Sequence, residues 1–140
     1  MRTIYKFKPT IPYSLHDMRI NKIVIKEDKI YLYFENGYVE AKEPYNQIDG
    51  YIIIEGVDFD FVSVHVLSDN GQYDRFAGEK LSLEDFLKKY EWTSFEVVDE
   101  LHGYNQVLYS GYLSVKDKDS FLAMDLSIYY EGNIVYDTHF

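Results

Sequence analysis

Residues 22–41 alternate between apolar side chains and polar or tyrosine side chains, which is the period of a β-strand with one buried face. Glu27-Asp28 and Asn36-Gly37 interrupt this alternation. We expect a two-residue hairpin turn at each, because Asn-Gly tolerates the positive φ angles of a type I′ turn. In the resulting three-stranded meander, apolar residues lie opposite apolar residues, and the other residues lie opposite one another. Its apolar face is predicted to hold Ile23, Ile25, Ile30, Leu32, Phe34, Val39 and Ala41.

The opposite face of this meander is predicted to gather tyrosine and glutamate. Its candidate binding residues are Tyr31, Tyr33, Tyr38, Glu35 and Glu40. Rigid aromatic area bordered by acidic groups can bind a basic protein surface, with charge steering the encounter. The same pattern also fits a plain solvated face or the second buried face of a sandwich strand, so these alternatives stay open at this point.

The next segments predict a connection over residues 44–50 and a short strand over 51–55. In residues 57–67 the apolar positions change parity, since Val57, Phe59 and Phe61 are followed by Val62, Val64 and Val66. A β-bulge near Phe61-Val62 would keep every large apolar group on the inner face. The polar residues 68–71 are expected to end this strand.

One helix is predicted over residues 83–90. Ser82 stands three residues before Asp85, a weak form of the capping box, and the apolar residues that follow have helical spacing. They are Leu83, Phe86, Leu87 and Tyr90. A helix of this length is not stable alone, so we expect it to pack on the sheet.

Further strands are expected over residues 95–101, 107–115, 122–130 and 134–138, separated by turns and a charged loop over 116–120. About eight or nine antiparallel strands with one short helix predict a mainly β fold, either a sandwich or a partly open barrel. Both architectures share the same alternation, so the sequence does not separate them. The length of 140 residues predicts a single domain over residues 1–140.

The net charge and the amino-acid composition limit the kinds of partner that the chain is expected to bind. The chain has 24 acidic against 14 basic residues and a formal net charge of −10, which opposes binding to nucleic acid or anionic membrane. It has no cysteine, which excludes disulfides and thiolate chemistry. No apolar run approaches the roughly 20 residues that span a bilayer, and residues 1–8 lack the apolar stretch of a signal peptide. We therefore expect a cytoplasmic protein.

Two sets of polar residues are candidates for chemistry. His16-Asp17 resembles the dyad of metal-dependent phosphohydrolases, but that chemistry needs further ligands, and Asp is also common in turns. Asp58, Asp60 and His65 are expected to share the outer face of one strand, where they form either a polar site or a solvated acidic face. The histidines show no paired spacing such as H-x-H. We therefore predict no metal, no cofactor and no catalytic residue.

Residues 15–20, with the sequence Leu-His-Asp-Met-Arg-Ile, are followed by the Ile23 and Ile25 strand and by the segment 34–38. Together they resemble the opening of several small uncharacterised bacterial β-rich families, some of which are immunity proteins of polymorphic toxin systems. The resemblance covers about the first 40 residues, and the strand at 109–112 is loosely similar. It implies binding rather than catalysis, and it carries no functional residue over.

These observations favour a non-enzymatic, acidic, cytoplasmic bacterial domain of the immunity type, which binds a basic protein partner. One alternative is a small-ligand-binding barrel or an unrecognised hydrolase, which predicts a deep pocket whose polar groups include His16 or His65. Another is a phage or mobile-element structural protein that assembles through an exposed strand edge. The oligomeric state is not indicated by the sequence.

Overall fold

Antiparallel strands make up most of the computed structural model, which describes residues 11–67, 78–117 and 121–139. Eleven strands, one α-helix and one 3₁₀ turn are found in these residues. The strands are β1 (Tyr13–Ser14), β2 (Met18–Lys26), β3 (Lys29–Phe34), β4 (Tyr38–Glu40), β5 (Gln47–Ile54), β6 (Ser63–Leu67), β7 (Glu79–Leu81), β8 (Trp92–Gly103), β9 (Gln106–Val115), β10 (Phe121–Tyr129) and β11 (Ile134–His139). The helix α1 covers Leu83–Lys89, and the 3₁₀ turn η1 covers Phe59–Phe61. The mainly β class with one short helix is therefore confirmed.

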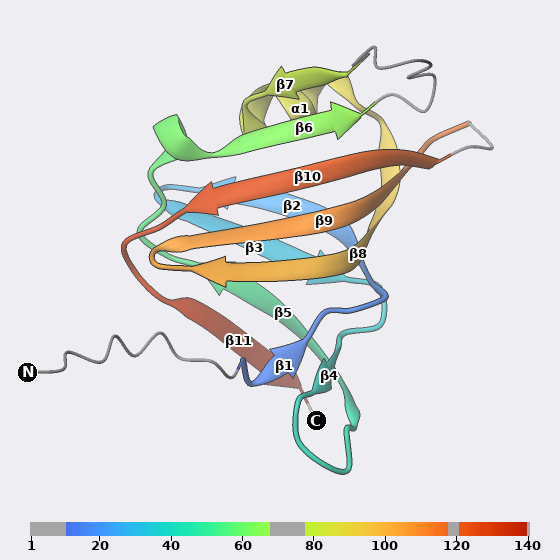
Figure 1. Cartoon of the computed structure of the whole chain (residues 1–140), viewed down its shortest axis with the longest axis vertical. Helices are drawn as coiled ribbons and strands as arrows, with labels where there is room; N and C mark the ends of the chain where they lie inside the picture. The colour runs from blue at the N-terminus through green and yellow to red at the C-terminus, as the bar shows by residue number, and fades with distance from the viewer. Residues whose placement is uncertain (1–10, 68–77, 118–120, 140) are drawn as a thin grey trace, which may run out of the picture.

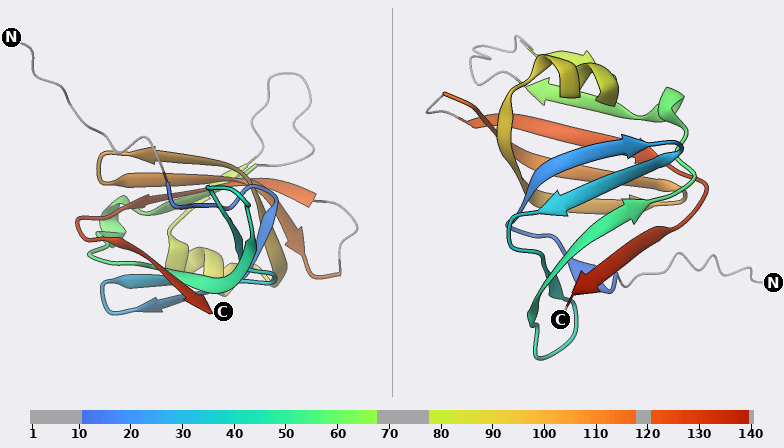
Figure 2. Two further views of the ribbon diagram at one scale, coloured as in Figure 1. Left: turned by 90° about the horizontal axis from the view of Figure 1, so that it is seen from below. Right: turned by 180° about the vertical axis from the view of Figure 1, so that it is seen from behind.

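The strands form two layers, and both layers belong to one continuous hydrogen-bonded sheet. The front layer holds β8, β9, β10, β6 and β7 (Figure 1), and the back layer holds β2, β3, β5 and β11, seen side by side in the rear view (Figure 2). Strand β2 pairs with β3 in the back layer and with β8 in the front layer. In the described residues β11 pairs only with β5 and β7 only with β6. The sheet is thus not closed, and it has the form of a sandwich or open barrel.

The core lies between the two layers and at the end covered by α1. Every second residue of β3 is buried, as is every second residue in the second half of β10, where Met124, Leu126 and Ile128 face the interior. Helix α1 begins after Ser82, whose side chain accepts a hydrogen bond from the Asp85 amide at 3.1 Å. It places Leu83 and Phe86 in the core. The predicted helix is confirmed, and it packs on the sheet as expected.

The first predicted hairpin is also confirmed. Ile25 lies opposite Ile30 and Ile23 lies opposite Leu32, and Glu27 in the turn has a φ of 57°. Ile23, Ile30 and Leu32 are buried, while Ile25 is partly buried against them. Local alternation was sufficient to fix this register because one face must be buried.

The second predicted hairpin, at Asn36-Gly37, is wrong. Strands β3 and β4 do not pair with each other, since both pair with β5: Tyr33 lies opposite Tyr51, and Tyr38 lies opposite Ile48. More residues lie between Tyr33 and Tyr38 than between their partners Tyr51 and Ile48, so residues 35–37 bulge out of one interrupted strand.

Gly37 makes this bulge possible. Its φ is 69°, and a Cβ built on it would lie 1.9 Å from the Ile48 carbonyl oxygen, so the backbone passes too close to β5 for any side chain. Gly37 thus supplies the positive φ of a bulge in place of the positive φ of a turn. As a result Tyr38 enters the core and Ala41 is exposed.

Two further expectations need correction. Residues 47–50 belong to β5 rather than to a connection, because Ile48 is buried and Gly50 lets β5 pass close to the Tyr38 hydroxyl and the Asp137 carbonyl. The parity change after Val57 is produced by η1 and not by a bulge near Phe61-Val62. Asp58 caps this turn by accepting a hydrogen bond from the Asp60 amide at 3.1 Å.

Some expected features lie outside the described residues. They are the segment 1–8, the turn at 68–71 and residues 118–120 of the charged loop. Among the described residues, no helix has the length and apolar character that crossing a membrane requires.

Candidate functional site

The outer side of the back layer carries three neighbouring tyrosine rings. Tyr31 and Tyr33 alternate with buried residues of β3, so both point outward, and Tyr51 lies opposite Tyr33 on β5. The ring centroids are 6.4 Å apart for Tyr31 and Tyr33, 5.3 Å for Tyr33 and Tyr51, and 6.4 Å for Tyr31 and Tyr51. All three side chains are half-buried, so part of each ring faces solvent.

Aliphatic residues extend this surface on both sides. Val24 of β2 and Ile53 of β5 both lie opposite Tyr31, and Val135 of β11 lies opposite Ile53. Each of them is half-buried. We use the name aromatic face for Val24, Tyr31, Tyr33, Tyr51, Ile53 and Val135.

Charged groups border the aromatic face. The Lys22 amine lies 5.7 Å from the centroid of the Tyr33 ring, within the range of a cation–π contact. The Tyr51 hydroxyl donates a hydrogen bond of 2.9 Å to Asp137, and this bond is the main cause of the raised pKa of Tyr51. The His139 ring lies 5.7 Å from that of Tyr51. The border therefore fixes the Tyr51 ring and combines both signs of charge.

Three of the five predicted binding residues are not part of this face. Tyr38 is fully buried, and its hydroxyl donates to the carbonyl oxygens of Tyr51 and Asp137, each at 3.2 Å. Burial raises the pKa of Tyr38 well above its ordinary value. Glu35 follows β3 and lies in the bulge, and Glu40 of β4 lies opposite Tyr13 of β1. The sequence grouped them through a hairpin at Asn36-Gly37 that does not form.

His16 and Asp17 lie in an exposed turn that attaches the start of β2 to β8. Asp17 has a φ of 63°, and its amide donates to the Val97 carbonyl at 2.7 Å. The His16 Nδ1 lies 2.6 Å from the Val98 carbonyl oxygen, and its Nε2 lies 3.4 Å from the Asp17 carboxylate. These two neighbours raise the pKa of His16, the Val98 carbonyl being the larger cause. The geometry matches the role of Asp in a turn.

The structure does not bring Asp58, Asp60 and His65 together on one strand face. Asp58 and Asp60 belong to the cap and the turn of η1, whereas His65 lies on β6 between Asp125 and Lys80. Within the described ranges, no three His, Cys, Asp or Glu side chains are grouped so as to hold a metal ion. The three residues therefore lie on two different elements, η1 and β6.

A buried polar cluster was not anticipated from the sequence. The His102 Nε2 and a Glu100 carboxylate oxygen lie 3.1 Å apart, and their side chains are only 14% and 7% exposed. Tyr109 lies opposite Glu100 on β9 and is fully buried, which raises its pKa. Within the described part of the chain, those two atoms and the Tyr109 hydroxyl lack an aligned hydrogen-bond partner. We call Glu100, His102 and Tyr109 the inner polar cluster.

A bulge in β8 explains why alternation along the sequence does not predict the inner polar cluster. The register between β8 and β9 shifts between Val97 and Asp99. Simple alternation from the buried Phe95 and Val97 would direct Leu101 inward, but the bulge reverses the parity. Leu101 is consequently 61% exposed, and the polar residues on either side of it point inward.

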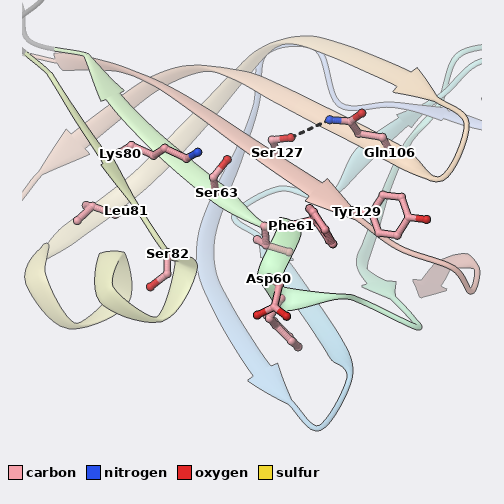
Figure 3. A pocket seen from close by; sticks show the side chains of 11 residues that line it. Asp60, Phe61, Ser63, Lys80, Leu81, Ser82, Gln106, Ser127 and Tyr129 are labelled. Carbon is pink, nitrogen blue, oxygen red and sulfur yellow. Dashed lines mark hydrogen bonds between the residues drawn. The ribbon is translucent and has the colours of Figure 1, made fainter.

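An open groove of about 590 Å³ lies on the front layer (Figure 3). It is formed by residues 59–63 and 80–82 together with Gln106, Ser127 and Tyr129. Phe61 is 66% exposed, and its ring lies 5.8 Å from that of Tyr129. Gln106 donates a hydrogen bond of 3.1 Å to the Ser127 hydroxyl. Asp60 contributes to this groove, whereas neither His16 nor His65 lines it.

Comparison with protein-family models, curated proteins and solved structures finds no match to this chain. The resemblance to immunity proteins therefore stays a prediction based on short segments. One of them, residues 34–38, is not the hairpin that the resemblance assumed.

Proposed function

We propose that this protein is a non-enzymatic protein-binding domain that presents its aromatic face to a basic surface of a partner protein. The observation that supports this proposal is the set of three tyrosine rings, 5.3 to 6.4 Å apart, on the outer side of β3 and β5. Tyrosine provides rigid contact area at a low cost in side-chain entropy. A partly exposed apolar patch with a polar rim is typical of an interaction site.

The charge of the chain indicates the chemistry of the partner. The net charge is −10, and Asp49 and Asp137 lie on β5 and β11 at one end of the aromatic face. A negative field accelerates association with a basic protein and disfavours acidic ones. An immunity protein that neutralises a basic toxin in the cytoplasm is the specific form of this proposal, and the resemblance of residues 15–20 supports it.

The test compares variants of opposite layers. The double variant Tyr31→Ala/Tyr33→Ala removes aromatic area from the face, while Tyr112→Ala removes a tyrosine that is 49% exposed on β9 in the other layer. Affinity capture with the full chain from native lysate is expected to recover a basic protein with the wild type and with Tyr112→Ala. Titration of that protein should show a loss of about 100-fold for the double variant, as expected for two contacts of about 1.4 kcal/mol each.

Salt provides an independent readout. If a basic surface is bound, the association rate should fall as ionic strength rises, because screening shortens the reach of the charges. A captured protein that binds the double variant as tightly as the wild type, or whose association is indifferent to salt, would contradict the proposal. Urea unfolding of the same variants establishes that each one is folded at the temperature of the titration.

A further inference from the structure

The groove on the front layer contains an aromatic corner, formed by Phe61 and Tyr129. Phe61 belongs to η1, which is capped by Asp58 and flanked by the buried residues Val57 and Val62. Its ring meets that of Tyr129 at 62° with the centroids 5.8 Å apart. Phe61 is 66% exposed, so the capped turn presents apolar surface to solvent. Exposed apolar surface of this kind is typical of a contact site.

A row of polar side chains runs beside the aromatic corner. Lys80, Ser63, Ser127 and Gln106 come from the four strands β7, β6, β10 and β9, which are neighbours in the sheet. Ser63 lies opposite Ser127, the Lys80 amine points toward Ser63, and Gln106 donates to Ser127 (Figure 3). We call these four residues the polar row. Serine hydroxyls both donate and accept hydrogen bonds, as the glutamine amide also does, so the row can pair with hydroxyl groups in either sense.

We propose that this groove binds a saccharide, with a sugar ring against the aromatic corner and its hydroxyl groups on the polar row. A sugar ring combines an apolar face of C–H groups with a rim of hydroxyls, which matches the two halves of the groove. The volume of about 590 Å³ lies within the range of roughly 300–1,000 Å³ found for small-ligand sites.

Other ligand classes fit the groove less well. A wholly apolar ligand would leave the hydroxyl and amide groups of the polar row without partners, which is costly when water is displaced. A nucleic acid is opposed by the net charge of −10. The groove lies on the front layer and the aromatic face on the back layer, so this inference goes beyond the proposed protein-binding function and does not depend on it.

Saturation-transfer NMR on the full chain provides the test. The probes are the hexasaccharides of β-1,4-linked glucose, α-1,4-linked glucose, β-1,4-linked N-acetylglucosamine and galacturonic acid, each at millimolar concentration. We expect saturation transfer to at least one probe, with the largest signals on ring protons that face Phe61 and Tyr129. Absence of transfer to all four would overturn the proposal.

Matched variants then locate the site by calorimetric titration of the bound probe. Phe61→Ala should weaken binding about tenfold, and Gln106→Ala should also weaken it, because the amide orients Ser127. Phe121→Ala is the control, since Phe121 is 56% exposed on β10 but does not line the groove. Wild-type affinity in Phe61→Ala, or an equal loss in Phe121→Ala, would likewise overturn the proposal. Phe61 and Gln106 are exposed, so these variants should keep the wild-type urea midpoint.

Discussion

Tyrosine is buried in one region of this molecule and lies at the surface in another. In the core, Tyr38 and Tyr109 are fully buried. On the aromatic face, Tyr33 and Tyr51 are half-buried, with their rings 5.3 Å apart on the outside of the sheet. The same side chain is thus a core residue in one place and contact area in the other. Register decides between these roles, and composition does not.

The two core tyrosines also differ from each other. The Tyr38 hydroxyl donates to backbone carbonyls of β5 and β11, whereas the Tyr109 hydroxyl belongs to the inner polar cluster and has no aligned partner in the described residues. A buried hydroxyl costs free energy unless it is hydrogen-bonded. The comparison therefore separates three states of tyrosine, which are buried with partners, buried without partners, and half-buried beside solvent.

The largest expected effect comes from removing a core ring. Tyr38→Ala should lower the free energy of unfolding by about 4 kcal/mol, because it leaves a cavity among Phe34, Tyr13 and Tyr136. Tyr33→Ala on the aromatic face should cost less than about 1 kcal/mol. Urea unfolding of both variants measures the difference. Similar losses in the two would show that Tyr38 is not a core residue or that the aromatic face is covered.

The next effect concerns the inner polar cluster. His102→Leu removes the polar neighbour of the enclosed Glu100 side chain. We expect a loss of about 2 kcal/mol in urea unfolding near neutral pH, because a buried polar group left without a polar neighbour is costly. The double variant Glu100→Leu/His102→Leu should recover most of this loss, since it also removes the enclosed carboxyl group. If His102→Leu is as stable as the wild type, then Glu100 is solvated rather than enclosed.

A smaller effect separates the two buried hydroxyls. Tyr38→Phe should cost about 1 kcal/mol, because a hydrogen bond to backbone carbonyls is lost. Tyr109→Phe should leave stability unchanged or raise it by up to about 1 kcal/mol, because the removed hydroxyl has no partner in the described chain. The same chemical change thus has opposite expected signs at the two sites. Equal costs for both variants in urea unfolding would contradict this assignment of partners.

The sequence predicted those parts of the fold that depend on nearby residues. The β2–β3 hairpin, helix α1 and the alternation of β10 follow from periodicity and capping within a few residues. The Asn36-Gly37 hairpin failed because a positive φ suits both a turn and a bulge. The competing partner, β5, begins only at Gln47. Choosing between the two requires knowledge of tertiary pairing, which local alternation does not contain.

The candidate sites were less predictable for the same reason. Tyr31 and Tyr33 share a face through alternation on one strand, but Tyr51 joins them only because β5 pairs with β3. The inner polar cluster depends on a bulge in β8 that no pattern of residues in the sequence indicates. The groove needs four strands, and its lining residues run from Phe59 to Tyr129. Sequence patterns identify what one strand presents, whereas sites of this kind are built across strands.

The smallest expected effect is a pH dependence caused by Tyr109. Burial holds the pKa of Tyr109 well above its ordinary value of 10.0, so the folded protein keeps this hydroxyl protonated where the unfolded chain ionises. Ionisation of Tyr109 therefore leaves the wild-type stability unchanged well below about pH 10 and lowers it as the pH rises from there toward the folded-state pKa. Tyr109→Phe removes this dependence. Its stability relative to the wild type should increase by about 0.4 kcal/mol between about pH 8 and about pH 10, where half of the unfolded groups are ionised. Urea unfolding at the two pH values measures this change. A difference that stays constant with pH would mean that water reaches the Tyr109 hydroxyl in the folded protein.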